Sequence, residues 1–467
     1  MKPPAGNRAD SAFVAGAPNM VSSRPMSPNQ KPAAALTPRT ALNYWLPLQA
    51  TWLMMAVEGP FVAAIIARLA DPKINLAAFG VATSLAWIVE SPIVMMLSAS
   101  NALVQDKIAF RRLRRFSTVL NAAVTAVMIL LLLPPVFRWI ARGVIGLPED
   151  VARLSAQSMI FLILWPAAIG YRRFYQGILI RGGKPRGVAW GTAVRLSTMA
   201  ATGVVLALAV RLPGACVGGG ALGIGVLAEA AASRFMARGL VRRLRSQSDE
   251  ECAFGRALTL DKIGRFYVPL AMTSFLSFSV HPLTSFFLGR SRMPIESLAV
   301  VPVIMGLAFI FRTGGIAVQE VVIALAGDRG EHKILLRRMA GTIGLAGTLG
   351  MAAVVFSPLA PVWMGTVSGL SPELAGFALL PARLLVLLPF LEAVLAYRRG
   401  ILVRARDTNP IAAAVLVQIA MVAAVFWLTV GPLGMIGATA AGIALTAGYL
   451  GGNGTLFILS RRGPVRS

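Results

Sequence analysis

The segment LAAFGVATSLAWIVE, residues 76–90, has a counterpart 222 positions later in LAVVPVIMGLAFIFR, residues 298–312. Both copies are almost wholly apolar, and both carry Leu-Ala pairs at the same two places. Neither alternates apolar and polar residues, so we predict helices that cross a membrane rather than barrel strands. At the last position the copies differ in charge, with Glu90 in the first and Arg312 in the second.

The match extends along the chain and predicts an internal repeat. The same offset pairs further prolines and charged residues, and an offset of 223 continues the series. The pairs are Pro47 and Pro269, Pro60 and Pro282, Arg68 and Arg290, Asp106 and Asp328, and Pro166 and Pro389. Similarity at a fixed spacing is the sequence signature of repeated structure.

Composition favours a membrane protein over a soluble one. Of the 467 residues, 56% are hydrophobic and only 14% charged, and the mean hydropathy is +0.71. Soluble domains carry about 25% charged residues. The net charge of +26 could indicate nucleic-acid binding, but the basic residues gather between apolar runs without a nucleic-acid motif, so we expect no such partner. Cys216 and Cys252 have no metal-binding spacing and are predicted to be inert.

Apolar runs of about 20 residues predict an all-α integral membrane fold of twelve transmembrane helices, six in each half. Their expected ranges are 42–67, 76–104, 116–140, 153–178, 187–211, 217–240, 264–289, 297–326, 339–363, 374–397, 409–430 and 433–459. The predicted domains are a disordered cytoplasmic tail (1–41), an N-terminal half (42–245), a cytoplasmic linker (246–263), a C-terminal half (264–460) and a cytoplasmic tail (461–467). Because six is even, the halves are parallel repeats around a central cavity.

Basic residues in alternate loops predict the orientation. They follow the even-numbered helices, as in Arg111–Arg115, Arg242–Arg245 and Arg461–Arg462, whereas 362–382 and 423–459 contain no Lys or Arg. By the positive-inside rule both termini are cytoplasmic. We expect a multi-pass protein of the inner (plasma) membrane, surrounded by the lipid bilayer and monomeric.

Several repeated features resemble the multidrug and toxic compound extrusion (MATE) family and its superfamily, which includes polysaccharide flippases. The first helix of each half carries a mid-membrane proline, Pro60 or Pro282, and the fourth begins with acidic residues after Pro148 or Pro372. A Gly-rich stretch opens each sixth helix, Gly218–Gly223 and Gly431–Ala438.

Within that superfamily, residues 77–85 and 380–389 look most like progressive ankylosis (ANK)-like proteins. The resemblance implies a MATE-like fold and secondary-active transport, with Na⁺ or H⁺ as coupling ion and no other cofactor. ANK-like proteins are associated with export of small polyanions, whereas drug-exporting relatives prefer organic cations.

Charged residues inside predicted helices are costly and therefore mark candidate sites. Glu58 lies beside Pro60, whose missing N–H frees a carbonyl, so we predict that Glu58 binds the coupling cation. Glu90 and Arg312 occupy equivalent positions and are predicted to pair across the cavity in one conformation. Arg195 and Arg383 are the further expected cavity residues.

Other charges receive simpler interpretations. Pro60 and Pro282 are expected hinges, and Glu229, Glu320 and Glu392 leave cation coupling open. Six arginines near helix ends are expected to reach for lipid headgroups. They are Arg68, Arg290, Arg172, Arg173, Arg398 and Arg399.

The sequence therefore predicts an exporter or antiporter for a small organic solute, with anionic cargo favoured by the excess of arginine. A lipid-linked oligosaccharide or polysaccharide flippase is the alternative. An intramembrane enzyme is less favoured, because we find no His/Glu metal cluster, no plausible nucleophile and base, and no phosphate loop.

Overall fold

Hydrocarbon offers the backbone no hydrogen-bonding partner, so a chain this apolar must satisfy its amides internally as helices. The computed structural model describes residues 36–184, 186–248, 252–327, 331–405, 407 and 409–462. Within these ranges twelve helical segments are long and apolar enough to cross a membrane, which confirms the predicted number. The expected tails over 1–41 and 461–467 lie largely outside the described residues, although α2 already begins at Pro38.

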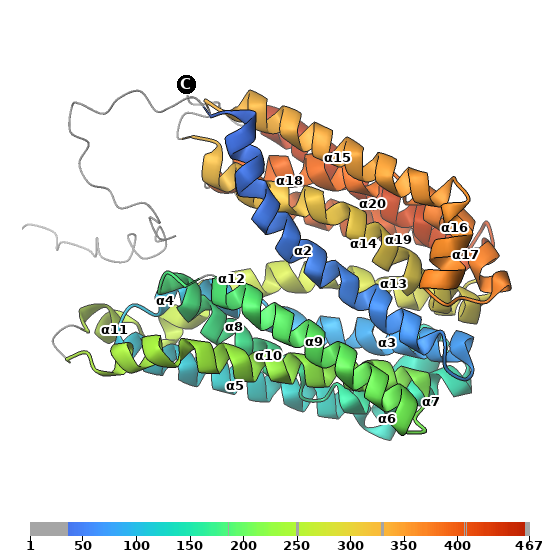
Figure 1. Ribbon diagram of the computed structural model, residues 1–467, viewed down its shortest axis with the longest axis horizontal. Helices are drawn as coiled ribbons and strands as arrows, with labels where there is room; N and C mark the ends of the chain where they lie inside the picture. The colour runs from blue at the N-terminus through green and yellow to red at the C-terminus, as the bar shows by residue number, and fades with distance from the viewer. Residues whose placement is uncertain are drawn as a thin grey trace, which may run out of the picture.

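The helices form two bundles that follow the two halves of the sequence (Figure 1). The N-terminal half contains α2 (Pro38–Ile66), α3 (Pro72–Glu90), η1 (Ser91–Ile93), α4 (Met96–Leu103), α5 (Lys107–Leu132), α6 (Pro134–Arg138), η2 (Trp139–Ile145), α7 (Glu149–Phe161), α8 (Trp165–Arg181), α9 (Arg186–Ala209) and α10 (Gly214–Arg245). After the short α11 (Ala253–Ala257), the C-terminal half contains α12 (Leu260–Phe278), α13 (Val280–Gly289), α14 (Pro294–Leu325), α15 (Lys333–Val355), α16 (Leu359–Pro361), η3 (Val362–Val367), α17 (Pro372–Leu384), α18 (Leu388–Arg404), α19 (Asn409–Val430) and α20 (Gly437–Arg462).

Four of the spans are interrupted, although the sequence predicted each as one continuous helix. The breaks separate α3 from α4, α7 from α8, α12 from α13 and α17 from α18. A proline follows each break within a few residues: Pro92, Pro166, Pro282 and Pro389. Proline lacks an N–H and its ring collides with the carbonyl four residues earlier, so it begins a new helix more easily than it continues one.

The two expected hinges differ. The helix is broken at Ser279, three residues before Pro282. A break is where a hinge would lie, but movement at Pro282 stays a prediction. By contrast, Pro60 lies inside the uninterrupted α2 and packs against α14, where its ring approaches Gly306. In this conformation α2 is therefore a continuous helix.

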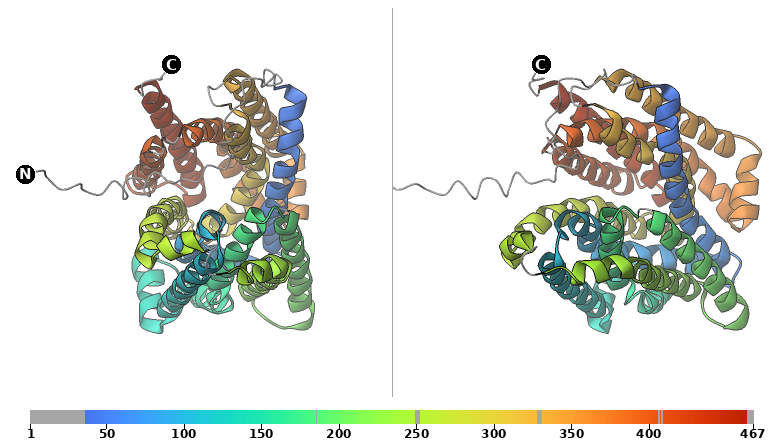
Figure 2. Two further views of the ribbon diagram at one scale, coloured as in Figure 1. Left: turned by 90° about the vertical axis from the view of Figure 1, so that its left-hand side faces the viewer. Right: turned by 60° about the vertical axis from the view of Figure 1, so that its left-hand side comes forward.

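The first span of each half reaches across to the other half. In α2, Trp45 Nε1 donates to the carbonyl of Gly314 in α14 at 3.0 Å. In α12, the Tyr267 hydroxyl donates to the carbonyl of Pro92 in η1 at 2.6 Å. Trp45 and Tyr267, and likewise Pro92 and Gly314, are related by the offset of 222, so this is one contact made twice. Figure 2 shows α2 running along one edge from bundle to bundle.

A second reciprocal contact lies at the other ends of the same two spans. Arg68 Nη2 donates to the carbonyl of Thr366 in η3 at 2.5 Å, and Arg290 Nη2 donates to the carbonyl of Gly143 in η2 at 2.8 Å. Both acceptors lie in π-helices, and the four residues obey the repeat offsets. These arginines are exposed, and they also bind the opposite half, which the sequence did not predict; that they reach lipid headgroups stays a prediction.

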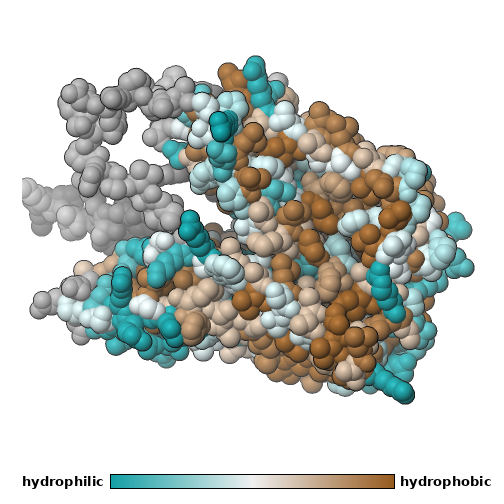
Figure 3. All heavy atoms as spheres, viewed as in Figure 1, coloured by the Kyte–Doolittle hydropathy of each residue, from teal (hydrophilic) through white to brown (hydrophobic). Residues whose placement is uncertain are grey.

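These contacts close one end of the molecule. We call it the closed end, and we call the end with the arginine-rich loops after α4, α8, α10, α14 and α18 the basic end. At the closed end Lys73 also pairs with Glu296 of the other half at 2.5 Å. Toward the basic end the bundles diverge, and the space-filling view shows a notch between them (Figures 1 and 3).

We predict that removing both reciprocal arginines opens the closed end. Hydrogen bonds from a charged donor contribute about 1.5–3 kcal/mol, so Arg68→Ala with Arg290→Ala should increase transient opening by roughly tenfold or more. The probe is Ser368→Cys, because Ser368 is only 2% exposed beside this contact, in a chain with Cys216 and Cys252 replaced. Its labelling rate with a membrane-impermeant thiol reagent should rise accordingly.

Arg138→Ala is the matched control for this experiment. Arg138 is exposed at the same end, but among the described residues its side chain bonds only to the Pro134 carbonyl of its own helix. Labelling should stay unchanged in this variant. Equal rates in the double variant and the parent would show that the reciprocal bonds do not hold this end closed.

Candidate functional site

A buried carboxylate in the N-terminal half organises a cluster of charged side chains. Glu229, from the middle of α10, is 0% exposed. It accepts hydrogen bonds from Arg172 and Gln176 of α8, the latter at 2.9 Å, and pairs with Arg195 of α9 at 3.2 Å. Close approach of α10 to α9 depends on Gly225, where a Cβ would lie 3.0 Å from Met199 and 3.2 Å from the Arg195 carbonyl.

Arg195 connects this cluster to the first span. Its second partner is Glu58 of α2, and the two side chains form an ion pair. Glu58 keeps 14% of its side-chain surface exposed, against 7% for Arg195 and none for Glu229. Glu58 is therefore the most accessible member of the ion-paired group, and breaking its one bond to Arg195 would detach α2 from the cluster.

Glu90 joins the same region from the end of α3. It is 6% exposed and lies within electrostatic range of Arg172, Arg173 and Arg195. The structure thus brings together Glu58, Glu90 and Arg195, which the sequence predicted as separate candidates. Arg172 was expected to reach for headgroups; that was wrong, because it is 5% exposed and paired with Glu229.

A second, smaller cluster lies in the C-terminal half. Arg312 of α14 donates to Glu392 of α18, from Nη2 at 2.5 Å and from Nε at 3.2 Å. The Tyr449 hydroxyl of α20 donates to the same carboxylate at 3.0 Å and contacts Arg312. This triad ties together three helices of one half.

The predicted pair between Glu90 and Arg312 is not formed in this structure. Arg312 is paired with Glu392 of its own bundle, and Glu90 lies within electrostatic range of Arg172 and Arg173 of its own bundle. The physical reason is that each bundle supplies opposite charges of its own, so neither residue needs a partner across the repeat axis.

Arg383 belongs to neither cluster. It is exposed near the closed end, where its Nε donates to the Val355 carbonyl at 3.1 Å and its guanidinium lies over the Phe356 ring. The expectation that it lines the cavity with the other candidates is therefore not met. A long basic side chain in this place suits the membrane boundary.

Sequence reasoning missed Gln176 and Tyr449 as members of the two clusters. Neither is charged, so the search for intramembrane charge passed over both. Their positions carried a signal all the same, because Gln176 lies one helical turn from Arg172, and Tyr449 lies in the last span of its half, as Glu229 does.

The chemistry of the N-terminal cluster is that of balanced ion pairs. Two carboxylates, Glu58 and Glu229, face two guanidinium groups, Arg172 and Arg195. Among the described residues no group of three or more His, Cys, Asp or Glu could hold a metal ion. A cation approaching Glu58 meets a carboxylate already engaged by arginine, whereas an anion approaching Arg195 competes with Glu58 for it.

Comparison with known proteins identifies the fold. No protein-family model matches the chain, and no curated protein matches it in sequence. Its structure is similar to an inward-facing MATE family transporter of the MOP superfamily (15% identity, TM-score 0.62, covering 90% of this chain and 97% of the other). It is also similar to the lipid II flippase MurJ in an inward closed conformation (13% identity, TM-score 0.65, covering 90% of this chain and 88% of the other).

A third similar structure is a MOP superfamily transporter from Pyrococcus furiosus, described as having a binding pocket of reverse polarity (15% identity, TM-score 0.55, covering 92% of this chain and 98% of the other). These likenesses confirm the MATE-like fold of twelve helices, and with it a multi-pass membrane protein. The nearer resemblance to ANK-like proteins stays a prediction.

We predict that Glu229→Gln destabilises the protein strongly, because it leaves Arg172 and Arg195 buried with too little negative charge. Removing one partner of a buried pair costs about 3–5 kcal/mol. The apparent unfolding temperature in detergent should fall well below that of the parent. Glu229→Gln combined with Arg172→Gln should recover part of the loss, because the charges balance again.

Glu149→Gln provides the comparison on the surface. Glu149 also pairs with an arginine, Arg142, but the two side chains are 63% and 55% exposed. Exposed ion pairs contribute about 0–1 kcal/mol, so this variant should unfold close to the parent temperature. If Glu229→Gln were no more destabilising than Glu149→Gln, Glu229 would not be the centre of a charge-balanced cluster.

Proposed function

We propose that the protein is a secondary-active transporter that moves a small organic anion across the membrane by alternating access. The observation that carries the proposal is the ion pair between Glu58 and Arg195. It joins α2, the first span that crosses to the C-terminal half, to the N-terminal bundle. The fold supports it, since similar structures are MATE transporters. The resemblance to ANK-like proteins supports anionic cargo, and so does the position of Arg195 beside the most accessible carboxylate of the cluster.

An anion at Arg195 would do more than bind. It would take the place of Glu58 and so release α2 from the N-terminal bundle, while Trp45 and Gln49 still hold α2 to the C-terminal half. A ligand shifts a conformational equilibrium only through contacts that differ between the two states. The exchange of Glu58 for substrate supplies such a difference.

The same pair suggests a coupling ion. Protonation of Glu58 removes its charge, weakens its bond to Arg195 and frees the arginine for the anion. A sodium ion would have to displace the guanidinium first. We therefore propose H⁺ in preference to Na⁺, with proton and anion each favouring the binding of the other.

A flippase for lipid-linked oligosaccharides is the second candidate, favoured by the likeness to MurJ at a TM-score of 0.65. Proteoliposomes separate the two functions. Uptake of labelled citrate, nucleotide or pyrophosphate, with an organic cation as comparison, reports small-solute transport, whereas movement of a fluorescent lipid-linked oligosaccharide between leaflets reports flipping. Flipping without uptake of any small anion would reject the proposed cargo.

We predict that Glu58→Gln separates binding from coupling. The neutral side chain should no longer compete for Arg195, so anion affinity should rise by roughly tenfold or more, since close charge pairs couple by about 1.5–7 kcal/mol. Accumulation driven by a pH gradient should be lost. Binding by isothermal titration across pH, together with uptake into proteoliposomes, measures both effects.

Glu373→Gln is the control, because Glu373 is an exposed carboxylate at the start of α17 that belongs to neither cluster. It should keep wild-type coupling. If proton and anion favour each other's binding, they should move in the same direction, which is symport. The MATE resemblance instead implies antiport, and the direction of proton movement during anion uptake distinguishes the two. Wild-type affinity and pH dependence in Glu58→Gln would show that Glu58 only stabilises the fold.

We further propose that the basic end faces the cytoplasm of a cell whose inner membrane holds the protein, by the positive-inside rule. A cysteine introduced at Ser467 should then resist membrane-impermeant thiol reagents in intact cells and react after permeabilisation. A cysteine replacing Ser371, just before α17 at the closed end, should show the opposite behaviour. Reaction of the Ser467 position in intact cells would reverse the orientation.

A further inference from the structure

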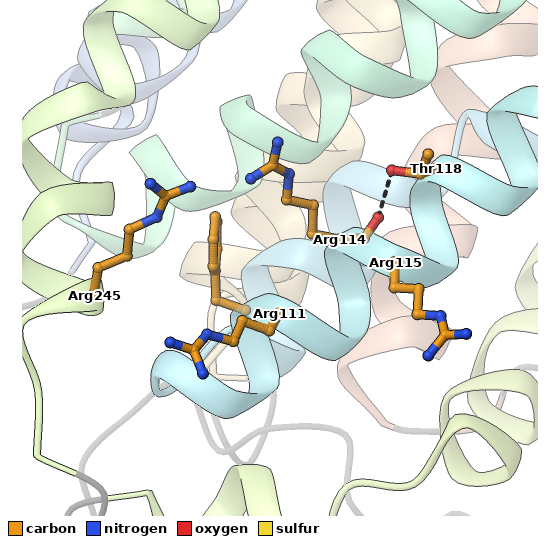
Figure 4. A pocket seen from close by; sticks show the side chains of 6 residues that line it. Arg111, Arg114, Arg115, Thr118 and Arg245 are labelled. Atoms are coloured by element: carbon orange, nitrogen blue, oxygen red, sulfur yellow. Dashed lines mark hydrogen bonds between the residues drawn. The ribbon is translucent and has the colours of Figure 1, made fainter.

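A pocket of 520 Å³ lies at the basic end of the N-terminal half, away from both charge clusters. Arginines line it from two helices: Arg111, Arg114 and Arg115 from the start of α5 and Arg245 from the end of α10. Figure 4 shows the guanidinium groups of Arg111, Arg114 and Arg245 around one hollow, with Arg115 turned away. No acidic side chain among the described residues lines this pocket.

These arginines do not form ion pairs with other described parts of the chain. The Arg245 guanidinium lies over the ring of Phe110, at 5.8 Å, whereas the nearby Arg112 donates to the carbonyl of Gly255. Three like charges facing one hollow repel one another, and an anion placed between them would offset that repulsion. The pocket thus has the charge of an anion site.

A second, mostly apolar groove begins near this pocket. One turn beyond Thr118, which lines the pocket, Asn121 begins a groove of 820 Å³. Most of its lining comes from α10 and the start of α8, whereas α5 contributes Asn121. Two arginines of α10, Arg234 and Arg238, also line it. Small and apolar side chains dominate it, including Ala167, Ala168, Leu227, Ala231 and Phe235.

We infer that the pocket and the groove together bind one anionic phospholipid. The phosphate of its headgroup would lie among Arg111, Arg114 and Arg245, and an acyl chain would lie along the groove. Basic residues at a membrane boundary attract anionic headgroups. A soluble anion would use the arginine pocket alone, whereas only a lipid has one charged end and one apolar body.

The groove also touches the back of the candidate site. Tyr171 and Ala230 line it, and their neighbours in sequence, Arg172 and Glu229, form the central ion pair of the N-terminal cluster. A lipid in the groove would therefore brace α8 and α10 against each other from outside. This inference does not depend on the proposed cargo or on the direction of transport.

The test uses the purified full-length protein, native mass spectrometry and thermal unfolding, with phosphatidylglycerol as the probe and phosphatidylcholine for comparison. We expect retention of phosphatidylglycerol and a higher unfolding temperature with it. The triple variant Arg111→Gln, Arg114→Gln, Arg245→Gln should weaken the lipid's apparent affinity at least tenfold. Ala231→Trp, which fills the groove, should weaken it without any change of charge.

The matched control removes the same charge elsewhere at the basic end, with Arg242→Gln, Arg243→Gln and Arg265→Gln, none of which lines the pocket. This variant should keep its lipid. Equal losses in the two triple variants would mean unspecific attraction, and would overturn the inference. So would stabilisation by glycerol 3-phosphate or inorganic phosphate as strong as that by phosphatidylglycerol, because the site would then take a free anion.

Discussion

The exchange of first spans between the two halves is the constraint on which the rest of this structure depends. α2 is bonded to the C-terminal half through Trp45 and to the N-terminal half through Glu58, and α12 makes the reciprocal crossing through Tyr267. Because both helices belong to both bundles, the halves cannot separate as free bodies. They can only change their angle, by breaking contacts at one end while contacts at the other end persist.

The repeat conserves this framework and not the polar interior. Crossing contacts occur twice at equivalent positions, and so do the helix-start bonds of Ala215 to Asn75 and of Ala438 to Ser297. The buried carboxylates differ, since Glu229 and Glu392 occupy non-equivalent positions, and the N-terminal cluster is ion-paired to α2 through Glu58. The repeated crossing contacts suit a motion in which both halves take part equally. The charge clusters differ, so we expect ligand binding to differ between the halves.

The sequence predicted the framework well because lipid imposes strict rules on it: spans of about 20 apolar residues, helical backbone and basic loops on one side. The helix breaks before Pro166 and Pro389 were within reach of proline stereochemistry but not of hydropathy. The partners of buried charges were not predictable, because equivalence in the repeat says where Glu90 and Arg312 lie along their helices and not which way each faces. That direction depends on neighbours such as Arg172 and Tyr449, which belong to distant segments.

Charge balance explains why α2 would not move without substrate in the proposed transport cycle. If Glu58 left Arg195 with nothing in its place, a guanidinium 7% exposed would lose one of its two carboxylate partners. Uncompensated buried charge costs several kcal/mol, enough to make that state rare. An anion at Arg195 removes this cost, and a proton on Glu58 removes the opposing cost of the freed carboxylate. The ion pair would therefore couple movement of the exchanged helix to occupancy of both sites, which is the requirement for transport without leakage.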